Sequence, residues 1–342
     1  MNPLSQDLDH ILEHTQGLWE ELRGQRIFIT GGTGFFGCWL LESFTWANDK
    51  LDLRASATVL TRDPGAFSNK APHLAGHPAV HLLTGDVRSF AFPEGVFSHV
   101  IHAATESSTR LNEADPLTML DTITRGTGRA LDLAVASRAR KFLLVSSGAV
   151  YGEQPFEVGH VPETHFGMPD TMDPRSAYGE GKRAAELLCA IYHRKHGIET
   201  KIARCFAFVG PYLPLDAHFA IGNFIRDALQ GGPIRVKGDG RPYRSYLYAA
   251  DLAIWLWTIL MKGAPCRPYN VGSEEALTVA QVAMCVSAQA GGIPIDIAER
   301  SENSAPRRRY VPATGRVRED LKLRPSLPLE MAVARTLAWH KR

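Results

Sequence analysis

A glycine-rich turn near the N-terminus restricts most strongly what this chain can fold into. Residues 26–30 form a short apolar run, and Gly31, Gly34 and Gly37 follow it at intervals of three residues, at the start of an amphipathic helical run. Gly31 permits a tight turn, Gly34 lets the backbone approach a pyrophosphate, and Gly37 lets the helix pack closely on the strand. The unpaired N–H groups at such a helix start favour a negatively charged ligand. The segment therefore predicts a strand, a turn and a helix that bind a dinucleotide.

Short β-rich runs alternate with helical runs beyond this turn, which implies parallel βαβ crossovers. We predict an α/β fold, a Rossmann-type doubly wound parallel sheet with a smaller, discontinuous C-terminal α/β substrate lobe. Ligands of such sheets collect at the carboxyl ends of the strands. The expected strands are 26–30, 57–61, 79–84, 98–103, 141–146, 200–205 and 268–272, and the expected helices lie near 34–47, 116–138 and 175–196.

From about residue 206, proline and glycine interrupt the alternation and shorter segments replace full crossovers. We expect an N-terminal helical extension over residues 1–24, a dinucleotide-binding domain over 25–205 plus 247–272, and a substrate-binding lobe over 206–246 plus 273–342. Within the extension, residues 3–23 are predicted to form one amphipathic helix that packs against the core or a partner subunit. Asp251 is expected to be the N-cap of a buried helix over residues 252–261.

Composition limits the partners of the chain. With 342 residues, 44% hydrophobic and 22% charged, and a net charge of +2, it reads as an ordinary globular protein without a nucleic-acid partner. The most apolar stretch, residues 252–261, is far shorter than the ~20 residues that span a bilayer, so we expect no membrane partner. The five cysteines are scattered, which favours reduced thiols, a cytoplasmic location and no metal site.

Tyr178 and Lys182 lie four residues apart in a predicted helix, so they share one face. A free tyrosine has a pKa near ~10 and is a poor base at neutral pH. A lysine ammonium beside it, together with the positive nicotinamide ring of an oxidised cofactor, would favour the phenolate. The pair therefore predicts a proton-transfer group beside a hydride carrier.

Three motifs together indicate a family. The segment 30–37, the segment 145–152 with Ser146-Ser147, and Tyr178-x-x-x-Lys182 occur in the order and separation that resemble the extended short-chain dehydrogenase/reductases. Within that group the chain looks like the nucleotide-sugar epimerases, dehydratases and 4-keto reductases. The resemblance implies that Ser147, Tyr178 and Lys182 are catalytic. It also implies two sets of binding residues: cofactor contacts from Gly31, Thr33, Gly34, Phe35, Phe36, Gly37, Arg62, Asp86, Val87, Ala103, Ala104, Tyr178 and Lys182, and substrate contacts from Thr105, Ser147, Arg244 and Arg309.

Arg62 indicates which of the two nicotinamide cofactors is preferred. An acid at the end of the second strand accepts from the ribose 2′-hydroxyl of NAD, whereas an arginine accommodates the 2′-phosphate of NADP. Here Thr61-Arg62 ends the strand, so we expect NADP to be preferred over NAD, although Asp63 follows directly.

The expected reaction is at C4 of a nucleotide-diphosphate sugar, as a 4-keto-6-deoxyhexose reductase or a C4 epimerase. The alternatives are a 4,6-dehydratase, a non-catalytic NADP-binding protein of the same fold, or a dehydrogenase for another substrate. Dehydratases of this family carry Asp-Glu where this chain has Gly148-Ala149, which argues against dehydration. Ile123 and Ala207 also replace asparagines usual in the family. Relatives pair through a four-helix bundle, so we expect a homodimer built on the helices near 116–138 and 175–196.

Overall fold

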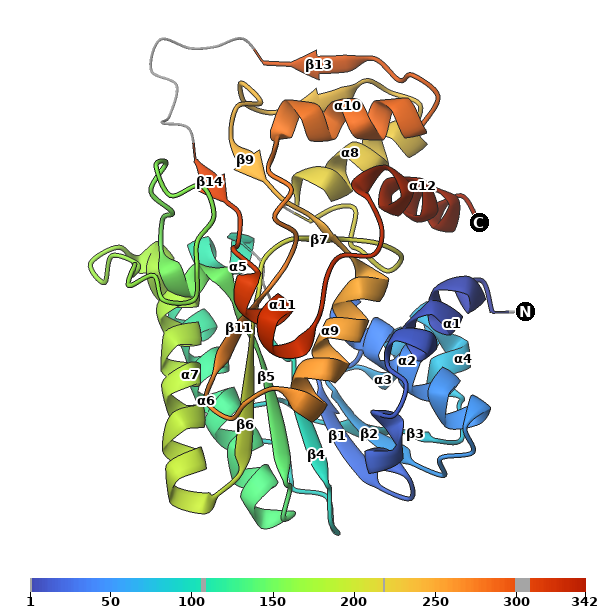
Figure 1. Ribbon diagram of the computed structural model, residues 1–342, viewed down its shortest axis with the longest axis vertical. Coiled ribbons are helices and arrows are strands. Elements are labelled where there is room, and N and C mark those ends of the chain that lie inside the picture. The colour runs from blue at the N-terminus through green and yellow to red at the C-terminus, as the bar shows by residue number, and fades with distance from the viewer. Residues whose placement is uncertain (1, 106–108, 218, 299–307) are drawn as a thin grey trace.

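A parallel sheet of seven strands forms the centre of the protein (Figure 1). The computed structural model describes residues 2–105, 109–217, 219–298 and 308–342. Strand order is β11–β6–β5–β4–β1–β2–β3, with every pairing parallel. The predicted doubly wound fold is confirmed, and each strand boundary lies within one residue of its expected place. The strands are β1 (Arg26–Thr30), β2 (Ser56–Thr61), β3 (Val80–Thr84), β4 (His99–His102), β5 (Lys141–Ser147), β6 (Glu199–Cys205) and β11 (Pro268–Val271).

Helices cover both faces of this sheet. Successive residues of β1 enter different cores: Phe28 belongs to the core beneath α6 (Pro116–Ala136) and α7 (Ala177–His196). Ile27 and Ile29 belong to the core beneath α2 (Phe35–Lys50) and α9 (Ala249–Lys262). This alternation follows from the two-residue period of a strand and buries the sheet on both sides. Among the described residues, no helix combines the length and the apolar character that a membrane crossing needs.

Shorter helices and strands form the region drawn above the sheet in Figure 1 and the segments that connect the strands of the sheet. Three small sheets pair β10 with β7, β9 with both β12 and β14, and β13 with β8. The remaining strands are β7 (Phe208–Val209), β8 (Ile234–Val236), β9 (Tyr243–Arg244), β10 (Leu247–Tyr248), β12 (Leu277–Thr278), β13 (Ile295–Ile297) and β14 (Arg309–Tyr310). The remaining helices are α3 (Pro64–Lys70), α4 (Pro72–Ala75), α5 (Thr109–Ala114), α8 (Ala220–Leu229), α10 (Val279–Gln289), α11 (Gly315–Leu321) and α12 (Leu329–His340), with short 3-10 turns η2 (Gly148–Tyr151) and η3 (Pro174–Ser176).

The N-terminal extension is two short helices, so the prediction of one helix over residues 3–23 is wrong. α1 (Ser5–His14) ends before Gly17, whose φ of +76° breaks the helix, and the 3-10 turn η1 (Trp19–Leu22) follows. The Thr15 hydroxyl bridges the break, since it accepts from the Trp19 indole at 2.8 Å. α1 contacts α2 and α9, and the Tyr248 hydroxyl donates to Asp7 Oδ2 at 2.7 Å. The extension therefore packs against the core of its own chain.

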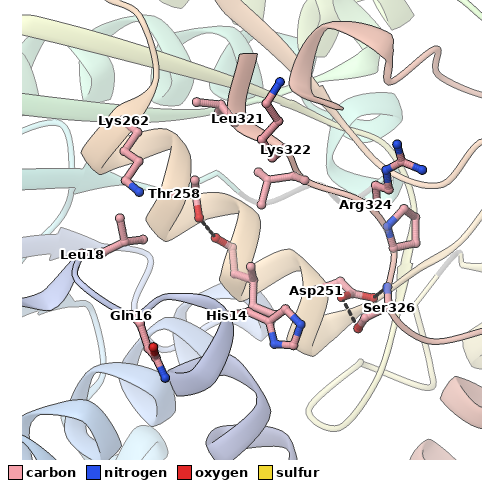
Figure 2. Close-up of a pocket in the computed structure, with 13 residues that line it drawn as sticks. His14, Gln16, Leu18, Asp251, Thr258, Lys262, Leu321, Lys322, Arg324 and Ser326 are labelled. Carbon is pink, nitrogen blue, oxygen red and sulfur yellow. Dashed lines mark hydrogen bonds between the residues drawn. The ribbon is translucent and has the colours of Figure 1, made fainter. Parts of the chain in front are cut away.

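A cavity of about 410 Å³ lies between this extension, α9 and residues 321–326 (Figure 2). Asp251 lies at its wall, and the prediction that Asp251 is the N-cap of the buried helix is wrong. α9 begins at Ala249, with Tyr248 in the N-cap position, so Asp251 lies inside the first turn. Its carboxylate accepts instead from the backbone N–H of Ser326 at 3.0 Å and from the Ser326 hydroxyl. Asp251 thereby joins α9 to the C-terminal segment.

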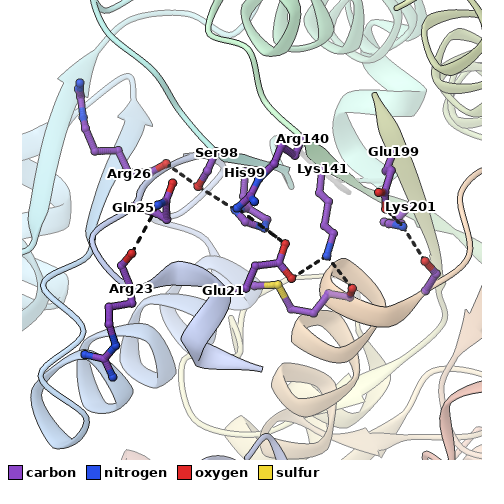
Figure 3. Close-up of polar contacts among 12 residues, drawn as sticks. Glu21, Arg23, Gln25, Arg26, Ser98, His99, Arg140, Lys141, Glu199 and Lys201 are labelled. Carbon is purple, nitrogen blue, oxygen red and sulfur yellow. Dashed lines mark hydrogen bonds and ion pairs between the residues drawn. The ribbon is translucent and has the colours of Figure 1, made fainter. Parts of the chain in front are cut away.

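Glu21 ties the extension to the amino ends of the central strands (Figure 3). The Lys141 ammonium donates to Glu21 Oε2 at 2.7 Å and to the Met261 carbonyl at 2.8 Å. His99 Nε2 lies 3.2 Å from Glu21 Oε1. Burial lowers the pKa of His99 to about 4, so its ring is neutral in the folded protein near pH 7.

Candidate active site

The predicted site residues come together at the carboxyl edge of the sheet. Because all strands are parallel, the ends of β1, β4 and β5 meet at that edge. Thr30, at the end of β1, hydrogen-bonds His102 Nδ1 at 2.8 Å and accepts from the Ala104 N–H at 3.2 Å. This bond holds Ala103 and Ala104 against the glycine-rich turn.

The glycine-rich turn leaves no room for side chains at two of its positions. Gly31 has φ of +71°, and a Cβ there would lie 2.5 Å from the carbonyl carbon of Ala103. A Cβ on Gly37 would lie 2.3 Å from the Gly31 carbonyl oxygen. Gly34 precedes α2, whose first turn carries unpaired N–H groups. This bare backbone cradle at a helix start fits the pyrophosphate of a dinucleotide.

Phe35 and Phe36 begin α2, with ring centroids 5.6 Å apart, and Phe36 packs on Phe208 at 4.9 Å. The Thr33 carbonyl accepts from the Lys70 ammonium at 3.0 Å. The backbone of this turn is therefore anchored from α3, by a lysine that the sequence motif does not include.

The predicted ribose and adenine contacts follow β2 and β3. β2 ends at Thr61, and the Asp63 carboxylate caps α3 by accepting from the Ala66 N–H at 2.9 Å. Asp63 is thus engaged as a helix cap beside the exposed Arg62. Asp86 is held by Arg88 through two bonds of 2.9 and 3.0 Å, which hold the pKa of that carboxyl down at about 2.

Val87 and Arg88 join this end of the site to α6. Val87 packs against Gly126 of α6, where an added Cβ would lie 3.0 Å from the Val87 side chain. Arg88 also reaches Asp121 of α6 at 3.2 Å. Sequence reasoning missed Arg88, although its place two residues after Asp86 is the signal that could have indicated it.

Lys182 and Tyr178 lie on one face of α7, turned toward β5. The Lys182 ammonium donates to the Val145 carbonyl at 2.8 Å and to Thr105 Oγ1 at 3.0 Å, and it lies 5.9 Å from the centre of the Tyr178 ring. Burial lowers the pKa of Lys182 to about 8. Thr105, predicted as a substrate contact, holds the lysine in this structure.

Ser147 lies at the end of β5, near Tyr178, and its hydroxyl accepts from the Ala149 N–H at 3.1 Å. Burial raises the pKa of Tyr178 to about 12, and the Ser147 hydroxyl acts in the opposite direction. The Tyr178 backbone N–H donates to Asn112 of α5 at 3.1 Å, a contact that sequence reasoning missed. The structure thus brings the predicted catalytic residues Ser147, Tyr178 and Lys182 together.

A partly buried ion pair behind these residues fixes α7 on the sheet. Arg204 of β6 donates to Glu186 of α7 at 2.7 Å, and Ser146 donates to the same carboxylate at 2.6 Å. Because Glu186 lies one turn after Lys182, these bonds set the position of the face of α7 that carries Tyr178 and Lys182.

The two predicted substrate arginines lie on neighbouring strands but on different faces of their small sheet. In the register of β9 and β14, Arg244 is opposite Tyr310, whereas Arg309 is opposite Tyr243. The Arg309 guanidinium lies 4.3 Å from the centre of the Tyr243 ring. Arg244 is largely buried, and burial lowers its pKa. The structure therefore separates Arg309 from Arg244.

Arg308 is the basic residue whose charge acts on Arg244. The Arg308 charge also lowers the pKa of Arg244, and its guanidinium lies 3.1 Å from the Glu153 carboxylate. In the described part of this segment, the charge of Arg308 therefore acts on Arg244, whereas Arg309 stacks on Tyr243.

Aromatic side chains fill the space beside Gly148. A Cβ on Gly148 would lie 2.8 Å from Phe206 Cε1 and 2.8 Å from the Tyr310 hydroxyl oxygen. An acid at this position, where dehydratases carry one, would require the side chains of Phe206 and Tyr310 to shift. Sequence reasoning did not select Tyr310, because β14 is two residues long and has no pattern of its own.

Two cavities lie away from this edge. One is that of Figure 2, and the other, of about 520 Å³, is lined by residues that include Tyr246, Arg318 and Arg324. None of the predicted catalytic residues lines either cavity. Within the described ranges, no three His, Cys, Asp or Glu side chains gather as metal ligands.

Comparison with known proteins agrees with this geometry. Residues 27–272 match the model of the NAD dependent epimerase/dehydratase family. The chain belongs to this family. UDP-glucuronic acid decarboxylase 6 of Arabidopsis thaliana is 34% identical over 261 residues, which make up 76% of this chain and 73% of the relative.

Solved structures agree in fold. UDP-glucose 4-epimerase from Thermotoga maritima, solved with UDP-glucose, has a TM-score of 0.75 and 21% identity over 92% of this chain and 98% of its own. dTDP-glucose 4,6-dehydratase from Streptomyces venezuelae, solved with NAD bound, has a TM-score of 0.77 and 24% identity over 92% of this chain and 97% of its own. The predicted family is confirmed, as is the prediction that the chain is an enzyme of an NAD-dependent family.

Proposed function

We propose that this enzyme oxidises C4 of a UDP-linked sugar to a ketone within its catalytic cycle. The observation that carries the proposal is the buried set of Ser147, Tyr178 and Lys182 at the same sheet edge as the glycine cradle. When bound there, the nicotinamide supplies the hydride acceptor. Tyr178 takes the proton of the C4 hydroxyl, Ser147 holds the same oxygen, and the Lys182 ammonium favours the phenolate.

The ketone then activates the neighbouring carbon. Relatives named UDP-glucuronic acid decarboxylase support loss of a group from the oxidised sugar, which is closer to the dehydratase alternative than to 4-keto reduction. A C4 ketone makes the C6 carboxylate of a hexuronic acid a β-keto acid. Its C5–C6 bond breaks with release of CO2, the electron pair forms an enolate, a proton returns to C5, and hydride returns to C4. The cycle ends without net oxidation.

The residues beside Ser147 favour loss of CO2 over loss of water. Elimination of water needs an acid and a base, and Gly148 and Ala149 supply neither. Phe206 and Tyr310 take up the space that an acid at position 148 would need. Decarboxylation of a β-keto acid needs no such pair. We therefore propose a UDP-hexuronic acid as the substrate class.

Incubation with NAD+ or NADP+ and, separately, UDP-glucuronic acid, UDP-glucose and dTDP-glucose tests this proposal. We expect labelled CO2 and a UDP-pentose from carboxyl-labelled UDP-glucuronic acid. A 4-keto-6-deoxy product from either glucose nucleotide would overturn the argument from Gly148. A C4 epimer as the main product would favour the epimerase prediction, and no turnover of any sugar would favour the non-catalytic alternative.

Three finer properties belong to the same proposal. NADP preference is supported by the exposed Arg62 and by the engagement of Asp63 as a helix cap. A homodimer through α6 and α7 is supported by exposed Leu187 and Ile191 on α7. A cytoplasmic location stays a prediction from the scattered free cysteines.

A further inference from the structure

The return of a proton to C5 needs a donor other than the residues that serve C4. Loss of CO2 leaves the electron pair of the C5–C6 bond in an enolate, and C5 must take a proton before hydride can return to C4. Tyr178 and Ser147 hold the C4 oxygen in the proposed reaction. Gly148 and Ala149, which follow Ser147, have no acidic group. A donor from the protein therefore lies on another segment.

The Tyr310 hydroxyl lies beside Gly148, the residue after Ser147. A Cβ at position 148 would lie 2.8 Å from the Tyr310 hydroxyl oxygen, which is close to the distance between Cβ and a carboxylate oxygen within an aspartate. The hydroxyl thus takes the place of an acidic side chain at position 148. Loss of water from a C4 ketone is a β-elimination across C5 and C6, so the acid of a dehydratase at this position acts next to C5. A proton donor at the same place reaches C5 as well.

The fold holds the Tyr310 ring at this place and leaves it accessible. The ring packs against Phe206 with centroids 4.7 Å apart, and in the register of β9 and β14 Tyr310 is opposite Arg244. Tyr310 is only half-buried, so its hydroxyl can meet a substrate and regain a proton from water. Burial raises the pKa of Tyr310, which keeps the hydroxyl protonated at neutral pH.

Two acidic side chains on neighbouring segments are engaged elsewhere. The Glu153 carboxylate is exposed and lies 3.1 Å from the Arg308 guanidinium. The Glu186 carboxylate accepts from Arg204 at 2.7 Å and from Ser146 at 2.6 Å. A carboxyl group held by a guanidinium is ionised near pH ~7 and has no proton to donate, whereas a phenol keeps its proton.

We propose that Tyr310 is the catalytic acid that protonates C5 after the loss of CO2. Its O–H bond breaks while the enolate electron pair forms the new C5–H bond, and the phenolate then takes a proton from water. An enolate carbon is a far stronger base than a phenolate, so this transfer is downhill. Hydride then returns to C4, and Tyr178 returns its proton to the C4 oxygen. The proposal rests on the proposed function, because it supplies the donor for one of its steps.

A single turnover of carboxyl-labelled UDP-glucuronic acid with NAD+ or NADP+ tests the role of Tyr310. Release of labelled CO2 and reoxidation of the reduced nicotinamide are followed together. Tyr310→Phe keeps the ring against Phe206, and we expect it to release CO2 at close to the wild-type rate. Reoxidation should be slower by about 10²–10⁴-fold, because hydride cannot return before C5 is protonated. A reduced nicotinamide and a UDP-4-keto-pentose should therefore accumulate.

Tyr269→Phe is the matched control, since that buried hydroxyl bonds Asp320 instead, and both of its rates should equal those of the wild type. Calorimetric titration with UDP checks that Tyr310→Phe keeps its binding site. Unchanged reoxidation in Tyr310→Phe would overturn the proposal, and loss of UDP binding would do so by showing a structural role. If the wild-type protein releases no CO2, the proposed function itself fails, and the role of Tyr310 fails with it.

Discussion

Tyr178 and Lys182 have different partners, so their substitutions should have different effects. Tyr178→Phe keeps the ring and removes the proton-transfer hydroxyl, and turnover should fall by about 10²–10⁴-fold with cofactor binding retained. Lys182→Ala should reduce both turnover and cofactor binding. Its ammonium favours the Tyr178 phenolate and also bonds Thr105 and the Val145 carbonyl. Steady-state rates with UDP-glucuronic acid and calorimetric titration with NAD+ measure the two quantities. Near-wild-type turnover in Tyr178→Phe would remove the chemical basis of the proposed function.

Substitution of Arg62 tests whether the protein binds NADP more tightly than NAD. Its guanidinium follows β2 at the carboxyl edge of the sheet, where a 2′-phosphate would lie, and the neighbouring Asp63 carboxylate is used as a helix cap. We expect Arg62→Ala to weaken NADP binding by about tenfold, the effect of one exposed charged hydrogen bond, and to leave NAD binding unchanged. Calorimetric titration with each cofactor gives the comparison. Tighter binding of NAD than NADP by the wild-type protein would show that the preference is wrong.

At the scale of elements, α6 and α7 form the expected dimer surface. On α7, Leu187 and Ile191 are exposed, whereas Leu188 and Tyr192 pack against the core. Leu117 and Leu120 of α6 are also exposed. We expect a dimer by light scattering at micromolar concentration, and a monomer for Leu187→Glu combined with Ile191→Glu. Met331→Glu, at an exposed position on α12, should leave the dimer intact; a monomeric wild-type protein would refute the arrangement.

Long elements were predictable from sequence and short ones were not. The central strands β1 and β5 are largely apolar runs, because helices cover both of their faces. β9 and β14 have two residues each, and their pairing joins segments more than sixty residues apart in sequence. No local pattern indicates such a pairing, so the separation of Arg309 from Arg244 and the position of Tyr310 beside Gly148 could only be found in the structure. Gly17 was visible in the sequence, but an isolated glycine is compatible with a helix.

At the scale of the whole molecule, two buried histidines couple stability to pH. Burial lowers the pKa of His99 to about 4 and of His102 to about 3, whereas unfolded histidine titrates near 6.5. Between these values the unfolded chain binds more protons, so stability present above pH ~6.5 is lost as the pH falls. At pH ~5, each of the two histidines should therefore lower the free energy of unfolding by about 2 kcal/mol relative to its value at neutral pH.

Urea unfolding at pH ~7 and ~5 measures this loss. His102→Gln should reduce the pH dependence by about half, because one of the two buried imidazoles no longer titrates. His196→Gln, at an exposed position near the end of α7, is the matched control and should leave the dependence unchanged. Equal pH dependence in His102→Gln and wild type would show that the acid sensitivity arises elsewhere.

The N-terminal extension has a consequence for the order in which the chain is made. Asp7 accepts from Tyr248, 241 residues later, and pairs with Arg335, 328 residues later. A ribosome releases the extension and α2 early and these partners late, so Asp7, and Trp19, whose ring lies 4.8 Å from that of Trp257, lack the α9 side of their docking surface during most of synthesis. Closing so long a loop is entropically costly and slow. The first helix to be made is therefore among the last to reach its place.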